Sequence, residues 1–266
     1  MRRSHFIRSA LCTVLTLFLL MLVISRAEME MPVEPSADVS TAQPGQPSDI
    51  EIQRPDASDT PETAEPRQLP DIEIRSWQYI LINDLSYSNH LKNSYIPQTV
   101  EVTDGIFISE KVADVFAEFM ADAEAAGHKV KMLIGYRSYS SQEYIFNGKA
   151  SIIYDANPGM SYEAAVAKAR ETVAYPGSSE HQLGLAADIA DASYSGYDMA
   201  MADSETMKWL TEHCHEYGMI LRYPEDKQTE TGREYEPWHF RYVGKEAAEY
   251  IMAEGICLEE FLALYK

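Results

Sequence analysis

The chain has 266 residues, of which 45% are hydrophobic, and this is enough for one large or two small domains with a substantial core. Its formal net charge is −20 at pH 7, which argues against nucleic acid or an anionic lipid surface as a partner. Three cysteines are too few for a disulfide framework. We expect Cys214 and Cys257 to be free buried thiols, although the two could pair if their geometry allowed it.

The N-terminus has the pattern of a secretory signal. Three arginines precede an apolar run from about residue 10 to residue 24, and small residues follow this run. The run is shorter than the roughly 20 apolar residues that span a bilayer. Residues 1–27 are therefore predicted to be a signal peptide, with an N-terminal membrane anchor as the alternative. Either assignment places the rest of the chain outside the cytoplasm, secreted or anchored at the outer face of the cytoplasmic membrane.

Residues 28–70 are rich in proline, serine, threonine and acidic residues and contain almost no aromatic residues. Such a segment cannot bury enough apolar surface to offset its ordering entropy, so it predicts a disordered, acidic, proline-rich linker. From Asp71 onward the composition becomes globular, and we expect residues 71–266 to form the functional domain.

The hydrophobic patterns in this domain predict its elements in chain order. They are a strand at 77–82, a helix from Ser109 to Gly127, a strand at 129–134, a short helix at 140–148, a helix from Ser161 to about 174, a helix from Ser204 to Gly218, a strand at 219–223, and one or two helices at 244–266. The pattern indicates a mixed α+β domain, with helices packed against a small, mostly antiparallel sheet.

Two short motifs carry the chemistry of the chain. The first places His181 and Asp188 seven residues apart, with the flexible Gly184 between them, and the second places Glu236 three residues before His239. Two imidazoles, one carboxylate and an open position are the ligand set of a catalytic zinc ion. Glu236 is then free to act as the general base toward water.

Each residue also has a structural interpretation when taken alone. A histidine near a glycine turn is more often hydrogen-bonded than metal-bound, Asp188 could cap a turn, and Trp238 could belong to the core. A second histidine-rich stretch, His213 to Glu216, lies in the predicted helix 204–218. Its two histidines are two residues apart and do not face one site on a helix, so a metal site is not expected there.

Taken together, the two motifs resemble those of a known enzyme family. SSEHQLGLAADI, followed by EPWHFRYVG, resembles the zinc D-alanyl-D-alanine carboxypeptidases of the VanY type, relatives of the VanX dipeptidases. The family pattern is S-x-H-x(6)-D followed by E-x-x-H, and every element of it is present. The resemblance extends to the segments at 79–83, 135–142 and 209–224. It implies a hedgehog/D-Ala-D-Ala peptidase-like fold.

The resemblance also implies roles for individual residues. Zn²⁺ would be bound by His181, Asp188 and His239, with Glu236 as the catalytic base. Arg137 would stabilise the developing oxyanion, or else bind the substrate carboxylate, because a planar guanidinium suits both. The alternative for Arg137 is a surface ion pair. The remaining substrate-binding residues would be Ser179 and Gln142, which would hold the carboxylate of the terminal D-Ala, and Trp238, beside the base.

The implied substrate is the D-Ala-D-Ala end of a peptidoglycan stem peptide, and we expect a monomer that releases the terminal D-Ala. An L,D-carboxypeptidase that acts on tetrapeptide stems is the closest alternative. A free dipeptidase is less favoured, because a secreted enzyme faces polymer. An inactive cell-wall-binding module of the same fold would have lost a ligand or the base, and none is lost here. A serine-type enzyme needs a Ser-x-x-Lys motif, which the chain lacks.

Overall fold

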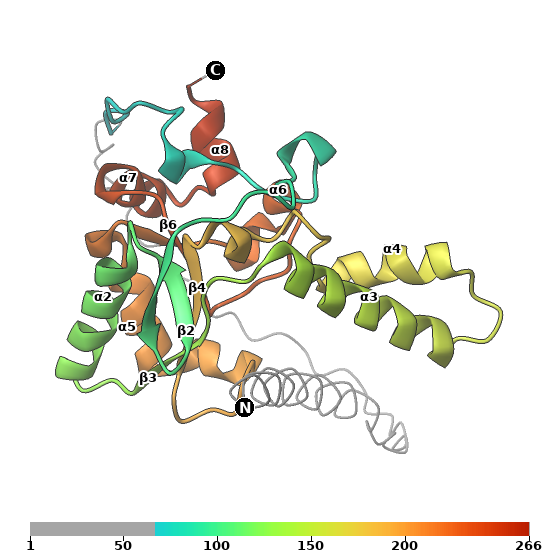
Figure 1. Ribbon diagram of the computed structural model, residues 1–266. Helices are drawn as coiled ribbons and strands as arrows, with labels where there is room; N and C mark the ends of the chain where they lie inside the picture. The colour runs from blue at the N-terminus through green and yellow to red at the C-terminus, as the bar shows by residue number, and fades with distance from the viewer. Residues whose placement is uncertain (1–66, 266) are drawn as a thin grey trace, which may run out of the picture. The chain divides into compact units, whose positions relative to one another are not determined.

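A four-stranded antiparallel sheet in the order β3-β4-β6-β5 lies at the centre of the fold (Figure 1). Its strands are β3 (Val130–Ile134), β4 (Ala186–Asp191), β5 (Met219–Leu221) and β6 (His239–Tyr242). The structure, a computed structural model, describes residues 67–265. The predicted signal peptide and most of the predicted linker therefore lie outside the described residues.

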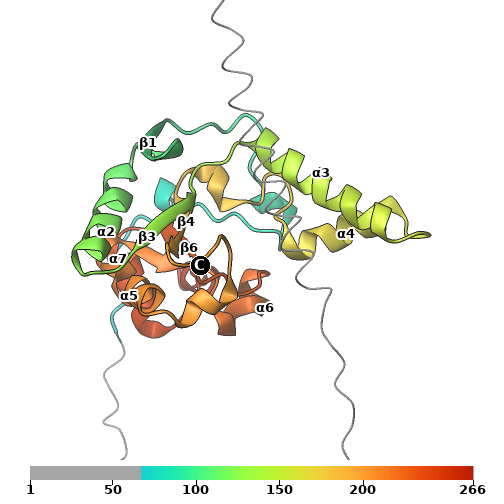
Figure 2. The ribbon, with the colours of Figure 1, turned by 90° about the horizontal axis from the view of Figure 1, so that it is seen from below.

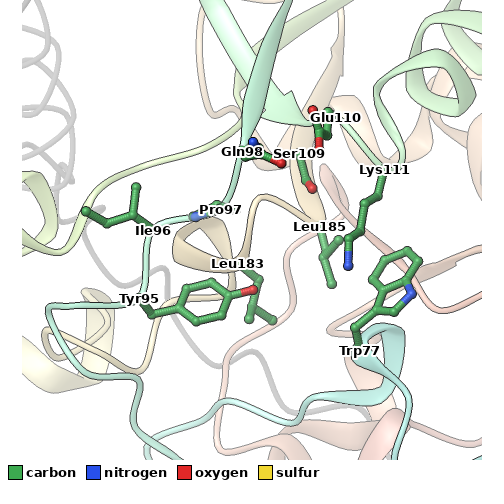
Figure 3. A pocket seen from close by; sticks show the side chains of 10 residues that line it. All are labelled: Trp77, Tyr95, Ile96, Pro97, Gln98, Ser109, Glu110, Lys111, Leu183 and Leu185. Atoms are coloured by element: carbon green, nitrogen blue, oxygen red, sulfur yellow. The ribbon is translucent and has the colours of Figure 1, made fainter.

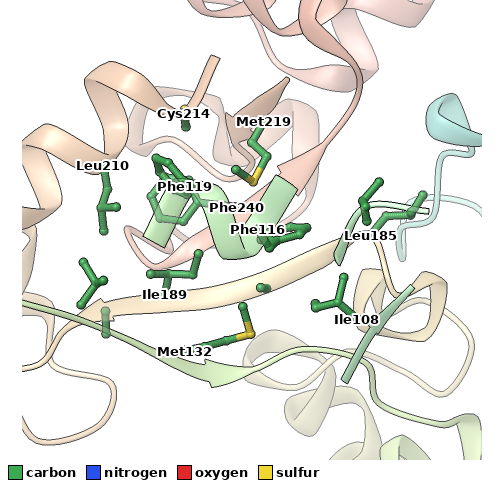
Figure 4. Close-up of a cluster of buried hydrophobic side chains, with 14 of the residues drawn as sticks. Ile108, Phe116, Phe119, Met132, Leu185, Ile189, Leu210, Cys214, Met219 and Phe240 are labelled. Atoms are coloured by element: carbon green, nitrogen blue, oxygen red, sulfur yellow. The ribbon is translucent and has the colours of Figure 1, made fainter. Parts of the chain in front are cut away.

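The register of β4 and β6 separates the two faces of the sheet. Asp188 lies opposite His239, and Ala187 lies opposite Phe240. Since successive side chains of a strand point to opposite faces, each of these pairs shares one face. Phe240 faces the helices α2 (Ala113–Ala125) and α5 (Glu205–His213), and its ring meets the ring of Phe119 edge to face, with centroids 5.7 Å apart. Figure 4 shows this core.

A second hydrophobic cluster fixes the C-terminal helices. The helices α7 (Lys245–Glu254) and α8 (Leu258–Ala263) contribute Ile251 and Phe261, which are buried together with Ile220 of β5. Tyr79, which lies far away in the sequence, packs in the same cluster, so the start of the domain is held against its end.

Two further helices, α3 (Tyr139–Ala156) and α4 (Tyr162–Thr172), form a hairpin that projects from the sheet in both views (Figures 1 and 2). The hairpin has a small core of its own, which contains Phe146, Ala150 and Ala169. The hydroxyls of Ser138 and Ser161 cap the N-termini of α3 and α4, as serine at this position commonly does.

A two-stranded hairpin of β1 (Thr99–Thr103) and β2 (Ile106–Ser109) packs over the end of β3. Its turn residues have positive φ, 42° at Asp104 and 77° at Gly105, as the tightest hairpin turns require. The remaining short helices are η1 (Trp77–Tyr79), η2 (Tyr87–Asn89), η3 (Glu180–Leu183), η4 (Met199–Asp203), η5 (Cys214–Tyr217), η6 (Glu225–Lys227) and α6 (Gln228–Thr231).

The predicted fold class is confirmed, as are the predicted strands at 129–134 and 219–223. The predicted helices after Ser161 and Ser204 are also present, and the C-terminal region contains two helices. Both Cys214 and Cys257 are buried and free, as expected. Within residues 67–265, none of the helices has the length and apolar character that a membrane crossing requires.

Three predicted elements differ from the structure. Residues 77–82 form no strand; η1 lies there, and the carbonyls of Gln78 and Ile80 accept hydrogen bonds from Arg241 Nη2. Their hydrogen-bonding capacity is thus used by a side chain instead of a neighbouring strand. The first long helix begins at Ala113, because Ser109 belongs to β2. The helix predicted at 140–148 extends to Ala156.

Candidate metal centre

Three predicted ligands meet in the structure. One ligand atom each from His181, Asp188 and His239 lies within 4.8 Å of the other two, and all three side chains are buried. Among residues 67–265 this is the single group of three or more histidine, cysteine or acidic residues that is arranged to hold a metal ion.

The short helix η3 and the end of β3 position His181. Its Nδ1 lies 2.9 Å from the carbonyl oxygen of Gly135, and since a carbonyl can only accept, Nδ1 carries the proton. The backbone N–H of Arg137 donates to the carbonyl of His181. Gly184 then reverses the chain at φ 69° and leads it into β4. The Nε2 lone pair of His181 is left facing Asp188, with 3.4 Å between Nε2 and Oδ1.

Strand pairing positions the other two ligands. Asp188 and His239 are cross-strand partners, and Asp188 Oδ1 lies 3.0 Å from His239 Nδ1. The second carboxylate oxygen of Asp188, Oδ2, accepts a hydrogen bond of 2.7 Å from the hydroxyl of Tyr197. The carboxylate is therefore oriented so that Oδ1 faces the two imidazoles.

The contacts within this group fit a metal ion better than they fit hydrogen bonds. Asp188 Oδ1 and His239 Nδ1 are buried, and neither has a hydrogen-bond partner among the described residues, although the two atoms are 3.0 Å apart. Their lone pairs converge on a common point. Ligands about 2.1 Å from a tetrahedral zinc ion lie about 3.4 Å from one another, close to the observed 3.0 and 3.4 Å.

The electrostatics of the group favour a cation at the same point. Burial opposes ionisation of Asp188, yet the neighbouring His181 and His239 hold the pKa of this carboxyl well below its usual range. Burial lowers the pKa of His181, so its imidazole is neutral, as a metal ligand must be. Burial also opposes a charge on His239, but the carboxylates of Asp188, Glu180 and Glu236 raise its pKa well above the usual range. The surplus of negative charge around His239 is what a bound divalent cation would neutralise.

Glu236 lies beside the three ligands. Its Oε2 is 3.4 Å from His239 Nδ1, and its side chain is 26% exposed, so it reaches both the metal centre and solvent. Its backbone is held on both sides, because Glu236 N donates to the carbonyl of Tyr223 and His239 N donates to the carbonyl of Glu236. The predicted base is thus close to the predicted ligands.

The predicted substrate-binding residues lie in different surroundings. Arg137 is half-buried and its Nη2 donates to Ser179 Oγ over 3.4 Å, so these two predicted residues meet. Burial lowers the pKa of Arg137, whereas the charges of Tyr197, Asp188 and Glu236 oppose this shift.

Gln142 and Trp238 make contacts within the scaffold. Gln142 is buried and its Nε2 donates to the carbonyl of Ala174 over 2.6 Å. The ring of Trp238 meets Tyr197 edge to face, with centroids 5.0 Å apart. Trp238 therefore supports the tyrosine that holds Asp188. A direct contact of Gln142 or Trp238 with substrate stays a prediction.

The side chains of the histidine-rich stretch in the 204–218 region contact other parts of the protein. His213 pairs with Glu216 at the surface, with 2.7 Å between His213 Nδ1 and Glu216 Oε1. Cys214 points into the core, where its thiol donates to the carbonyl of Thr211.

Sequence reasoning assigned no role to two residues that touch the ligands. Tyr197 donates to Asp188, and the buried carboxylate of Glu180 lies 3.6 Å from His239 Nε2. Glu180 directly precedes His181 in the chain, so the sequence indicates that the two residues are close. The direction in which the Glu180 side chain points is defined only in the folded protein. Tyr197 lies in a loop and offers no comparable signal.

A pocket of about 150 Å³ lies on the β1–β2 side of the domain (Figure 3). Lys111 extends over the ring of Trp77 there, with its Nζ 4.6 Å from the ring centroid. Leu183 and Leu185, on either side of the Gly184 turn, close the pocket from the direction of the first motif. None of the three predicted metal ligands lines it.

The sequence of this domain is similar to a known protein family and to individual proteins. Residues 105–245 match the VanY family, D-alanyl-D-alanine carboxypeptidase. The D-alanyl-D-alanine carboxypeptidase of Enterococcus faecalis is 38% identical over 189 residues, which are 71% of this chain and 66% of that protein. The YodJ protein of Bacillus subtilis is 39% identical over 162 residues, 60% of this chain and 55% of that protein. The chain thus spans less than two thirds of the length of these two relatives.

Solved structures agree with the sequence comparisons. VanYB in complex with D-alanine-D-alanine is 36% identical with a TM-score of 0.62, over 72% of this chain and 100% of that one. A mutant of VanY from a VanB-type resistance cassette, in complex with Zn(II), is 36% identical with a TM-score of 0.60, over 70% and 99% of the two chains. The LD-carboxypeptidase LdcB is 34% identical with a TM-score of 0.60, over 69% and 84%. The chain therefore belongs to the VanY family of D-alanyl-D-alanine carboxypeptidases.

Proposed function

We propose that this protein is a zinc-dependent D-alanyl-D-alanine carboxypeptidase, which removes the terminal D-Ala from peptidoglycan stem peptides. The observation that carries the proposal is the meeting of His181, Asp188 and His239 around one point, with Glu236 beside them. The family membership, the zinc-bound VanY mutant and the VanYB complex with D-alanine-D-alanine support it.

His181, Asp188 and His239 would hold the zinc ion through Nε2, Oδ1 and Nδ1. When bound, zinc supplies Lewis acidity, which lowers the pKa of water and polarises a carbonyl group. Glu236 accepts the proton of the attacking water and then passes it to the nitrogen of the departing D-Ala. Its partial exposure fits this task, because the carboxylate must exchange protons in every cycle.

Arg137 and Ser179 would recognise the negative charges of the substrate. A guanidinium donates two parallel hydrogen bonds to a carboxylate, and the same group can stabilise an oxyanion that develops at the scissile carbonyl. Arg137 Nε is buried and has no hydrogen-bond partner among the described residues, so the guanidinium has an unpaired donor. Gln142 and Trp238 would complete the site, Trp238 through its contact with Tyr197.

An L,D-carboxypeptidase that acts on tetrapeptide stems is the second candidate. The likeness to LdcB supports it, because the TM-score of 0.60 and the identity of 34% nearly equal the values for the VanY structures. The zinc ligands and the base would serve both reactions. The difference between the two substrates lies in the residue before the scissile bond, L in one and D in the other.

We further propose that the protein acts outside the cytoplasm as a monomer. The family's action on cell-wall peptides and the predicted signal peptide at residues 1–27 support the location. The predicted linker at 28–70 would separate the domain of residues 71–266 from a membrane if the signal is retained as an anchor.

A direct test offers pentapeptide and tetrapeptide stems to the purified zinc-loaded protein and measures the product masses. Loss of one D-Ala from the pentapeptide alone supports the lead function, whereas cleavage of the tetrapeptide alone moves the assignment to the L,D class. Zinc-loaded protein that cleaves neither stem overturns both.

The Glu236→Gln variant tests the base. It should bind zinc as well as the wild type does and lose activity by about 10²- to 10⁴-fold, because glutamine cannot accept the proton. Activity close to the wild type would show that another group takes the proton.

A further inference from the structure

A buried ion network adjoins the metal centre. Glu180 Oε1 lies 2.9 Å from Arg222 Nε and 2.8 Å from Arg241 Nη1, and all three side chains are completely buried. Arg222 extends the network through two hydrogen bonds to the carboxylate of Glu259, at 2.7 and 2.9 Å. Two carboxylates and two guanidiniums balance in charge, as a buried cluster requires.

The network leaves one oxygen unused. Both arginines approach the same atom of Glu180, Oε1. The other oxygen, Oε2, faces Nε2 of His239 at 3.6 Å. Both of these atoms are buried, and neither has a hydrogen-bond partner among residues 67–265. Each is therefore the natural partner of the other, since leaving either unpaired is costly in a buried site.

The position of this pair bears on the metal centre. The opposite nitrogen of the same ring, His239 Nδ1, is the atom that faces Asp188 Oδ1 at 3.0 Å. The hydrogen bond that one ring nitrogen makes decides which nitrogen keeps its lone pair. A carboxylate at Nε2 favours the proton there and leaves Nδ1 free for a metal ion.

We propose that Glu180 is a positioning residue for His239. Its Oε2 accepts the Nε2 proton, fixes the ring orientation and the tautomer, and so presents Nδ1 to the metal. Arg222 and Arg241 hold the carboxylate by its other oxygen, so that Oε2 cannot turn away. This inference rests on the metal site of the proposed function and adds to it a residue that does not touch the metal.

The alternative is that the network only stabilises the fold. It joins η3, β6 and the segment after β5 to α8, so breaking it anywhere should lower stability. Glu259 is a matched control, because it makes an equally close pair with Arg222 and has no contact with His239. A purely structural role predicts that Glu180 and Glu259 variants affect zinc binding alike.

The Glu180→Gln variant has a defined consequence. The amide oxygen should take the place of Oε1 against the two guanidiniums, which turns the NH₂ group toward His239 Nε2. Two donors then face each other, so the required tautomer is disfavoured. Zinc affinity, measured by chelator competition on the folded protein, should fall by about 10- to 100-fold. Glu259→Gln should lower the melting temperature and leave zinc affinity within about threefold of the wild type.

The Glu180→Asp variant keeps the charge against the arginines and shortens the side chain by one methylene. It should fold even where Glu180→Gln does not, and it should bind zinc more weakly because the carboxylate retreats from His239. Equal zinc affinity in the wild type and in the folded Glu180 variants overturns the inference and leaves the proposed function standing. Wild-type protein that binds no zinc overturns the proposed function itself.

Nitrogen-15 NMR of histidine provides a readout that does not depend on zinc affinity. The Nε2 proton of His239 should resonate far downfield and exchange slowly with water in the zinc-loaded wild type. Glu259→Gln should leave this signal in place, and Glu180→Gln should shift it upfield. Exchange in the wild type as fast as that of an exposed imidazole overturns the inference.

Discussion

At the scale of single residues, Arg137 is the cation that we propose acts on the substrate. It is half-buried, donates to Ser179, and its pKa responds to the charges of Asp188 and Glu236. We predict that Arg137→Ala lowers kcat/KM by about 10²- to 10³-fold, because a buried donor to developing charge is lost. Zinc affinity should stay unchanged, and steady-state kinetics with chelator competition checks both.

Arg137→Lys keeps the charge and loses the planar fork, so it should recover only part of the activity. Arg170→Ala is the control, since Arg170 pairs with Asp84 over 3.0 Å on the α3–α4 hairpin and its side chain is 42% exposed. A similar loss of activity in both alanine variants would contradict the role of Arg137.

Tyr197 offers a second test at this scale. Its hydroxyl donates to Asp188 Oδ2 over 2.7 Å and so fixes the direction of the carboxylate. Tyr197→Phe should weaken zinc binding by about tenfold, because partners that orient a ligand contribute at this level. Tyr217→Phe removes a tyrosine–aspartate bond of the same 2.7 Å length, to Asp122 at the surface. It should leave zinc binding unchanged in the same competition assay.

The three ligands could be proposed from the sequence because they lie in two short motifs with fixed spacing, and the structure brings them together. The residues that orient them could not. Glu180, Tyr197 and the carbonyl of Gly135 contact them in directions that only the folded chain defines. Backbone carbonyls in particular carry no residue-type signal, since every residue has one.

At the scale of elements, Gly135 couples the β1–β2 hairpin to the metal centre. A Cβ at this position would lie 2.3 Å from the carbonyl oxygen of Phe107 in β2, and that contact is with backbone. Gly135→Ala should therefore displace the end of β3, together with the carbonyl that holds His181. We predict a loss of about 1–3 kcal/mol in unfolding free energy, together with weaker zinc binding.

Denaturant unfolding and zinc titration check this prediction. Gly105→Ala is the control, because Gly105 has a φ of 77° and no atom within 4 Å of the added Cβ. It should cost about 1 kcal/mol through backbone strain alone and leave zinc affinity unchanged. Normal zinc binding in a destabilised Gly135→Ala variant would show that the hairpin does not position His181.

The elements that sequence reasoning found are those with a regular pattern and a clear end. The β1–β2 hairpin was missed, although Asp104-Gly105 between two β-branched runs is a strong turn signal. The strand predicted at 77–82 failed for a different reason. Tyr79 is buried and Trp77 is half-buried, but Arg241 occupies the carbonyls that pairing would use. A tertiary contact of this kind is invisible in the local sequence.

At the scale of the whole molecule, the reactivity of Cys214 and Cys257 measures how well the core excludes solvent. Cys214 and Cys257 are buried and unpaired, and burial raises the pKa of each thiol to about 12. Because the thiolate is the reactive form, neither should react with a disulfide reagent in the native state. In a Cys12→Ser variant, no thiol should react until the protein is unfolded, when both should. Fast reaction of one thiol in buffer would contradict this packing.

The sequence predicted the fold class, whereas the order of strands came only from the structure. Local patterns identify strands and helices, but the pairing of β4 with β6 joins segments about fifty residues apart, and no local signal specifies it. The shared place of Ala187 and Phe240 in the main hydrophobic cluster follows from that pairing.

The pairing of β4 with β6 has a consequence for how this domain can change in evolution. A one-residue slip of β6 along β4 would exchange the faces of His239 and Phe240, which would put a phenyl ring in the metal centre and an imidazole in the core. Length changes in the connection between Ala192 and Pro237 leave this parity intact. Insertions and deletions should therefore accumulate in such connections, where they can change substrate preference. The length of β6 should stay at four residues.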